Sequence, residues 1–178
     1  MTLLQHELTD FKVNAFQNDE FHEVTKADVL GHWSLFFFYP ADFTFVCPTE
    51  LEDLARNYAK FKEIGCEIYS VSCDTHFVHK AWHDANEKIA KIQYPMLADP
   101  TALLAKDLDT YNEVDGMAER GDFIVSPKAR SWRMKSSPPT LAAMPKNYYA
   151  VCKLSVRPRT WRSGLPCQLD SGRGHHRT

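Results

Sequence analysis

The sequence of 178 residues has no CxxC pair and an odd number of cysteines, five. Structural zinc sites usually take closely spaced cysteine pairs, and disulfide scaffolds use an even number of cysteines, so both are disfavoured. No apolar run is long enough to cross a bilayer. The start, "MTLLQHELTD", lacks a basic segment followed by an apolar one, so no signal peptide is predicted and a cytoplasmic location is expected.

Acidic residues are nearly missing from the end of the chain. Residues 128–178 contain 11 Lys and Arg but one acid, Asp170, whereas residues 1–127 contain 10 Lys and Arg and 22 Asp and Glu. Six of the ten prolines lie from Pro127 onward. The break predicts a domain over 1–127 and an irregular basic tail over 128–178. Trp and Tyr among the basic residues give only a weak nucleic-acid signal, so no nucleic-acid or membrane partner is expected.

The first 127 residues alternate between strand-like and helix-like patterns. "WSLFFFYP" is a continuous apolar run closed by Pro40, typical of a central strand covered on both faces. In the next segment Leu51, Leu54, Tyr58 and Phe61 recur at helical spacing before Gly65. These patterns predict an α/β fold with a parallel or mixed central sheet flanked by helices. The expected strands are 33–40, 66–74, 94–100 and 121–127, and the expected helices are 47–65, 76–92 and 101–111.

Cys47 lies where the first of these strands gives way to a helix. A reactive cysteine must be a thiolate, and a helix N-terminus stabilises negative charge with unpaired N–H groups and its dipole. Thr44 could cap this helix or hold a bound oxygen, Pro40 could shield the site from water, and Glu50 could orient a cation. A packed, inert thiol is the alternative for such a cysteine.

The spacing Pro40-x-x-x-Thr44-x-x-Cys47 favours the reactive thiol. The stretch "FYPADFTFVCPTE" resembles the peroxidatic motif of the peroxiredoxins, thiol peroxidases with a thioredoxin-like fold. The stretches "VSCDTHFVHKAWH", "DPTALLAKDLDTY" and "GMAERGDFIVSP" extend the likeness. From Leu4 to Pro127 the chain resembles the typical two-cysteine peroxiredoxins, among them the bacterial alkyl hydroperoxide reductase C subunits.

The resemblance implies specific roles. Cys47 would attack a hydroperoxide and become a sulfenic acid. Pro40 and Thr44 would shape the pocket, with Thr44 bonding the peroxide, and Arg120 would favour the thiolate and polarise the peroxide. No cofactor would be needed, because sulfur takes the oxidising equivalent. The expected partners are a hydroperoxide substrate and a dithiol reductant, either a flavoprotein disulfide reductase or thioredoxin.

The other cysteines and the histidines favour structural roles. Cys66 and Cys73 flank a predicted strand and are interpreted as packed core thiols. Three histidines share one predicted helix at spacings that could suggest a metal, but HExxH is missing, so an exposed helix face and no metal site are expected. These histidines are His76, His79 and His83.

The resemblance stops after Pro127, where the family continues with a dimerisation strand, a helix and a resolving cysteine. Codons for Lys128–Leu154, read one base over, can encode "EGEIVAYEVIASNVGRNAEELLRRLQA", a strand and a family-like helix. Codons for "GLPCQLDSGRGHHR" can encode "VCPANWTPGEATIA", which is similar to the resolving segment. Two single-base losses account for both, so Cys152 and Cys167 are interpreted as products of translation out of frame.

Cys167 is nevertheless the candidate resolving thiol, because its distance from Cys47 along the chain is about right. The family forms homodimers and decamers, and this sequence is expected to do so poorly. Two other functions stay open at this point: a thioredoxin-like binding or chaperone protein with a basic tail, and an impaired frame-shifted product. Peroxide consumption by a Cys47→Ser variant separates the enzyme from the binding protein.

Overall fold

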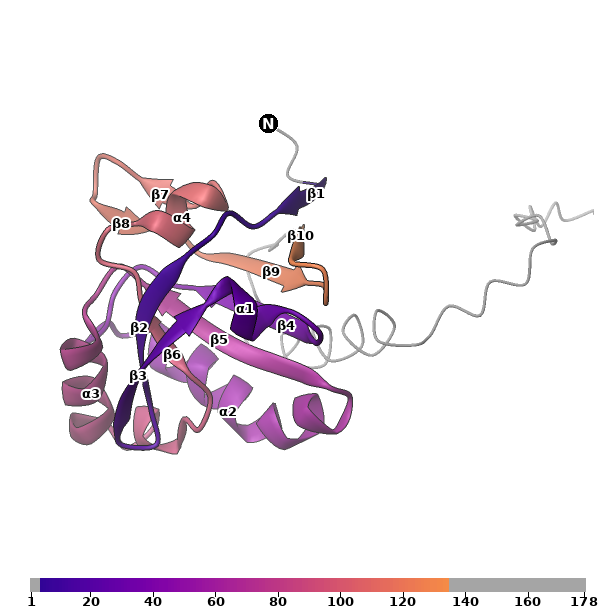
Figure 1. Cartoon of the computed structure of the whole chain (residues 1–178). Coiled ribbons are helices and arrows are strands. Elements are labelled where there is room, and N and C mark those ends of the chain that lie inside the picture. Colours follow the sequence, from indigo (N-terminus) through magenta and orange to yellow (C-terminus); the bar gives the residue numbers. More distant parts are fainter. Residues whose placement is uncertain (1–3, 135–178) are drawn as a thin grey trace, which may run out of the picture.

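The computed structural model describes residues 4–134, and the elements below belong to this part of the chain. Strands alternate with helices through the middle of the chain, as the sequence patterns predict (Figure 1). In chain order the elements are β1 (Leu4–Glu7), β2 (Lys12–Gln17), β3 (Glu20–Thr25), α1 (Lys26–Val29), β4 (Trp33–Phe38), α2 (Cys47–Glu63), β5 (Cys66–Ser72), α3 (His76–Ala85), the 3-10 helix η1 (Ile89–Lys91), β6 (Met96–Ala98), α4 (Leu103–Asp107), β7 (Tyr111–Asn112), β8 (Met117–Ala118), β9 (Gly121–Val125) and β10 (Arg130–Met134).

Eight of the described strands form one mixed sheet in the order β1-β10-β9-β4-β5-β6-β2-β3. The central strands β4, β5 and β6 run parallel, and each of the other neighbouring pairs in this sheet is antiparallel. Parallel strands need a crossover connection, and α2 and α3 lie in the two crossovers between them. The mixed sheet flanked by helices confirms the predicted fold class.

Strand β4 divides the apolar core into two layers. Every residue from Ser34 to Phe38 is buried, which confirms a central strand covered on both faces. Leu35 and Phe37 pack with α2 and α3, whereas Phe36 and Phe38 pack with α1 and α4. Because successive side chains of a strand point to opposite faces, one strand anchors both layers. The loop that leaves its carboxyl end toward α2 therefore starts from a fixed point.

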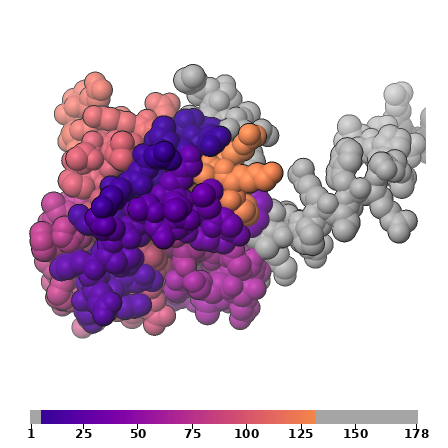
Figure 2. All heavy atoms as spheres, in the orientation of Figure 1, coloured from indigo at the N-terminus to yellow at the C-terminus, as the bar shows by residue number. Residues whose placement is uncertain are grey.

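Three parts of the sheet and its surroundings were not predicted from the sequence. Strands β1, β2 and β3 precede the first predicted element and cover much of the face in Figure 2. Strands β7 and β8 form a separate short hairpin. Strand β10 lies beyond Pro127, between β9 and β1. The predicted boundary at residue 127 stays a prediction, because nearly all of the proposed tail, from residue 135 onward, lies outside the described residues.

Within residues 4–134 the structure has no helix both long and apolar enough to cross a membrane.

Candidate active site

Cys47 is the first residue of α2. Its side chain is fully buried, and Pro48 follows at the second helical position, where the missing proline N–H would have no helical partner in any case. The N-cap residue, Val46, makes no side-chain capping bond. The positive end of a 17-residue helix is therefore presented beside the thiol, and this arrangement favours negative charge on sulfur.

Arg120 connects the thiol to a buried carboxylate. It lies in the turn between β8 and β9, and its Nη2 donates to Cys47 Sγ at 3.1 Å. Its Nε donates to Glu50 Oε2 at 3.2 Å. The Glu50 side chain is 3% exposed, whereas that of Arg120 is 41% exposed. The structure thus brings together three of the predicted site residues, with Glu50 fixing the guanidinium that contacts sulfur.

The charge of Arg120 is reinforced by these two neighbours. Burial alone would lower the pKa of Arg120, but the negative charges of Cys47 and Glu50 and their hydrogen bonds raise it above its ordinary value. The same contact also acts on the sulfur, because a fixed positive guanidinium stabilises the negative charge of a thiolate beside it.

Pro40 and Thr44 lie on the loop between β4 and α2, and both are half-buried. Thr44 does not cap α2, since the N-cap residue is Val46 and no side chain makes a capping bond there. The Thr44 hydroxyl instead donates to the Ala41 carbonyl at 3.1 Å. Its oxygen can still accept a hydrogen bond from another molecule. The neighbouring Phe43 has a φ of 57°, which is uncommon for a residue with a side chain.

The remaining cysteines differ clearly from Cys47. Cys66 is buried, and its Sγ lies 3.7 Å from the Glu67 carbonyl oxygen, which agrees with the packed thiol that was predicted. Cys73 is half-buried against the core, where burial and the charge of Asp99 raise its pKa to about 11. Such a thiol is protonated near neutral pH and is a poor nucleophile. Cys152 and Cys167 lie outside the described residues.

The prediction of an exposed histidine face on α3 was wrong. His79 is fully buried, and His76 and His83 are half-buried. His79 bonds Asp42 through Nδ1 at 2.7 Å and the Leu97 carbonyl through Nε2 at 3.1 Å. Helical spacing alone does not tell which face of α3 is covered. The only signal in the sequence for this pair is the position of Asp42 in the loop before Cys47.

One group of side chains has the spacing of a metal site. Ligand atoms of Asp19, His83 and Asp84 lie within 4.8 Å of one another, and both aspartates are exposed. The Lys80 ammonium lies 3.6 Å from Asp19 and 3.0 Å from Asp84, so a cation already balances part of the negative charge of this group.

The chain is similar in sequence to known proteins. The chain matches the AhpC/TSA family over residues 4–130. It is 55% identical over 127 residues to alkyl hydroperoxide reductase C of Bacillus subtilis, covering 71% of this chain and 68% of that protein. It is 53% identical over 128 residues to alkyl hydroperoxide reductase C of Salmonella typhimurium, covering 72% of this chain and 68% of that protein.

A solved structure shows the same fold. The crystal structure of Enterococcus faecalis AhpC superposes with a TM-score of 0.79 at 46% identity, covering 87% of this chain and 93% of that one. This similarity confirms the predicted thioredoxin-like fold. The family match, the two relatives and the shared fold establish that the chain belongs to the AhpC/TSA family.

Proposed function

We propose that Cys47 is the reactive thiol of this thiol-dependent hydroperoxide reductase. The Cys47 thiolate attacks the terminal oxygen of a hydroperoxide, the O–O bond breaks, and an OH group is transferred to sulfur to give a sulfenic acid. The other oxygen leaves as an alkoxide or hydroxide and takes up a proton. The contact between Arg120 and Cys47 at the start of α2, at 3.1 Å, carries this proposal.

The surrounding residues have distinct parts in the reaction. Arg120 stabilises the thiolate and the charge that develops on the leaving oxygen, and Glu50 keeps its guanidinium in place. The Thr44 hydroxyl accepts a hydrogen bond from the O–H of the peroxide, since its own hydrogen is directed to Ala41. Pro40 helps to keep water from the buried sulfur. A binding or chaperone protein would not need a guanidinium that donates a hydrogen bond to a thiol.

The substrates proposed are hydrogen peroxide and small organic hydroperoxides. The B. subtilis and S. typhimurium relatives are named for the reduction of alkyl hydroperoxides. The sulfur atom itself accepts the oxidising equivalent, so the reaction is expected to proceed without metal, flavin or haem. Electrons return from an external dithiol protein, either a flavoprotein disulfide reductase or thioredoxin. A chelator should therefore leave peroxide consumption unchanged.

The test is peroxide consumption by the purified chain and by Cys47→Ser, with Cys66→Ser as the matched control for losing a buried thiol. Loss of activity in Cys47→Ser alone supports the proposal. Full activity in Cys47→Ser would refute it.

A two-cysteine cycle needs a resolving thiol, and the candidate for it, Cys167, lies outside the described residues. Its flanks, Leu165-Pro166 and Gln168-Leu169, differ from the family's resolving segment, so we expect slow resolution and over-oxidation of Cys47 to sulfinic acid under excess peroxide. Non-reducing electrophoresis and mass spectrometry after one equivalent of peroxide measure this. A rapid, nearly complete disulfide from Cys47 to Cys167 between subunits would contradict it.

A dimer through the segment after Pro127 is expected to be weak in this chain. Arg130–Met134 is already paired on both sides within its own chain, by β9 and by β1. Pro138 and Pro139, further on, cannot donate ladder hydrogen bonds. Sedimentation analysis measures the assembly, and a stable dimer paired through residues 129–137 would refute this expectation.

A further inference from the structure

A buried polar network lies beside the loop that leads to Cys47. The Tyr39 hydroxyl donates to Asp42 Oδ1 at 2.7 Å, and His79 Nδ1 lies 2.7 Å from Asp42 Oδ2. The side chains of Asp42 and His79 are 1% and 0% exposed, and Tyr39 is fully buried. Buried polar groups of this kind are costly unless each one has a partner.

Each ring nitrogen of His79 has a partner. His79 Nε2 faces the Leu97 carbonyl oxygen at 3.1 Å, and a carbonyl can only accept, so Nε2 carries a hydrogen. On the other side of the ring, Nδ1 lies 2.7 Å from Asp42 Oδ2. The other oxygen of Asp42 receives the Tyr39 hydroxyl. The ring nitrogens, both carboxylate oxygens and the hydroxyl all have partners, and such a complete network is rigid.

The same loop is held a second time through its backbone. The Asp42 N–H donates to Asp74 Oδ2 at 2.8 Å, and this oxygen also accepts from Ser72 Oγ at 2.9 Å. The side chain of Asp42 is therefore tied to His79 on α3, which in turn bonds Leu97 of β6, and its main chain is tied to Asp74, just after β5.

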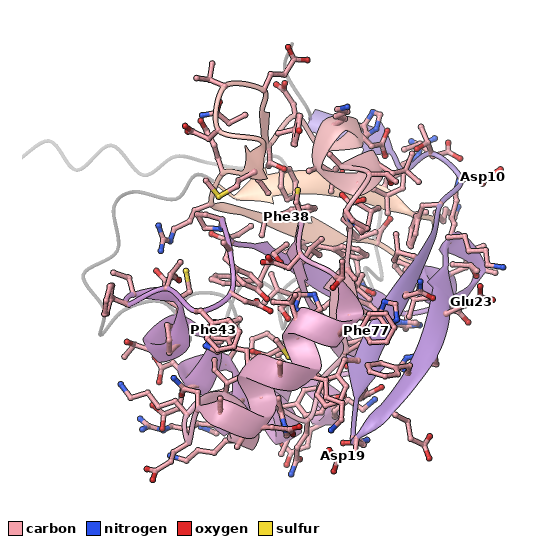
Figure 3. The ribbon with its side chains drawn as sticks, turned by 90° about the vertical axis from the view of Figure 1, so that its left-hand side faces the viewer. Asp10, Asp19, Glu23, Phe38, Phe43 and Phe77 are labelled. Atoms are coloured by element: carbon pink, nitrogen blue, oxygen red, sulfur yellow. The ribbon has the colours of Figure 1, made fainter. Side chains whose placement is uncertain are left out.

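The fixed residue is followed directly by a strained one. Phe43 has a φ of 57°, and its ring, visible on the loop in Figure 3, packs 6.1 Å from the Trp82 ring on α3. A residue with a side chain keeps such a conformation only where its surroundings enforce it. Thr44 comes next in the chain, so the network and this turn together set the position of its hydroxyl.

We propose that Asp42 and His79 are positioning residues for the peroxide site, and this rests on the proposed role of Cys47. Their bond holds the loop of residues 40–46 in the conformation that places Pro40 and Thr44 before the thiol. The thiolate itself is stabilised separately, by α2 and Arg120. Loss of the bond should thus slow the reaction with peroxide far more than a reaction that needs only the thiolate.

Two substitutions of His79 separate this role from simple packing. In His79→Asn the amide nitrogen occupies the place of Nδ1 and keeps the bond to Asp42, whereas in His79→Gln it occupies the place of Nε2 and keeps only the bond to Leu97. Both remove the ring and one hydrogen bond. His76→Gln, on the same helix but outside the network, is the matched control.

The measurements are the second-order rate constants of Cys47 with hydrogen peroxide and with iodoacetamide, together with the melting temperature. We expect His79→Gln to react with peroxide about 100-fold more slowly than the unchanged chain, His79→Asn to stay within about threefold of it, and iodoacetamide rates to change little in either. Equal peroxide rates for the Asn and Gln variants, or equal losses with both reagents, would overturn the proposal.

Tyr39→Phe keeps the proposal testable if both His79 variants unfold. It removes the hydroxyl that donates to Asp42 and keeps the ring, so about a tenfold loss in the rate with peroxide is expected, and an unchanged rate would overturn the proposal.

Cys47→Ser in the same assay separates the two proposals. If Cys47→Ser still consumes peroxide, the proposed function fails; if it is inactive while the His79 and Tyr39 variants react normally, only the positioning role fails.

Discussion

The Arg120 guanidinium and the Cys47 sulfur, separated by 73 positions in the chain, lie 3.1 Å apart at the start of α2. The bond requires the turn after β8 and the helix after β4 to meet at one end of the sheet. Antiparallel pairing of β4 with β9 provides this, because Phe38 at the end of β4 is opposite Gly121 at the start of β9.

Replacing Arg120 by Met should slow the reaction of Cys47 with peroxide about 100- to 1,000-fold, as expected for removing one donor to the developing charge. Arg120→Lys should restore little, because a single ammonium cannot bond Sγ and Glu50 Oε2 in the same fork. Stopped-flow kinetics measures the rate. Arg56→Met is the matched control, since Arg56 also pairs with a buried glutamate of α2, Glu52, and its loss should leave the rate unchanged.

Gly121→Ala should destabilise the fold by about 1–3 kcal/mol, because the added Cβ would lie 2.8 Å from Thr110 Cγ2. Thr110→Ser removes that methyl group but keeps the hydroxyl that donates to the Ala105 carbonyl. Combining the two should recover part of the loss, as measured by urea unfolding of the single and double variants. Additive effects would show that this contact is not the cause.

Leu54→Ala should lower the free energy of unfolding by about 2–5 kcal/mol, because Leu54 is buried between α2 and the sheet. Lys60→Ala, on the exposed side of the same helix, should have a small effect. Chemical denaturation gives both values. A similar loss in the two variants would argue against the packing described here.

Cys73 should react slowly with iodoacetamide at pH 8, where only about one molecule in a thousand has the thiolate at a pKa of about 11. Its rate should rise about tenfold per pH unit until the pKa is reached. The pKa is raised above its ordinary value of 9.0, so the folded state binds this proton more tightly than the unfolded chain, and stability should fall as pH rises from 9 toward 11. Peptide mass spectrometry after timed alkylation measures the rate, and rapid labelling at pH 8 would contradict the prediction.

The apolar patterns predicted the part of the fold that positions Cys47. A continuous buried run indicates β4, and helical spacing with a stop at Gly65 indicates α2, since both depend on local sequence. β3 was missed because four of its six residues are exposed, so it lacks a strong apolar period. β10 was missed because its sequence, "RSWRM", lies in a basic stretch without a clean strand period, and because one of its two partners, β1, was not predicted.

The site residues that lie in one sequence motif could be predicted. Those that are brought to the site only by contacts in the folded structure could not. Cys47, Thr44 and Glu50 lie in one short stretch, so their proximity follows from the chain. Thr44 was expected to cap α2 or to bind oxygen, and the structure excludes only the cap. His79 depends on which face of α3 meets the sheet, and this is set by packing of Trp82 and the strands beneath it.

The pairing of β1 with β10 has a consequence for synthesis of the chain. Leu4 lies opposite Trp132, so the first described strand finds its partner only when the last one has been made. During synthesis on the ribosome, β1 therefore has no pairing partner until more than a hundred further residues have been added. Contacts of such separation form late and slowly. A chain released early, before residue 130, would leave β9 as a bare sheet edge, and such an edge is prone to aggregation.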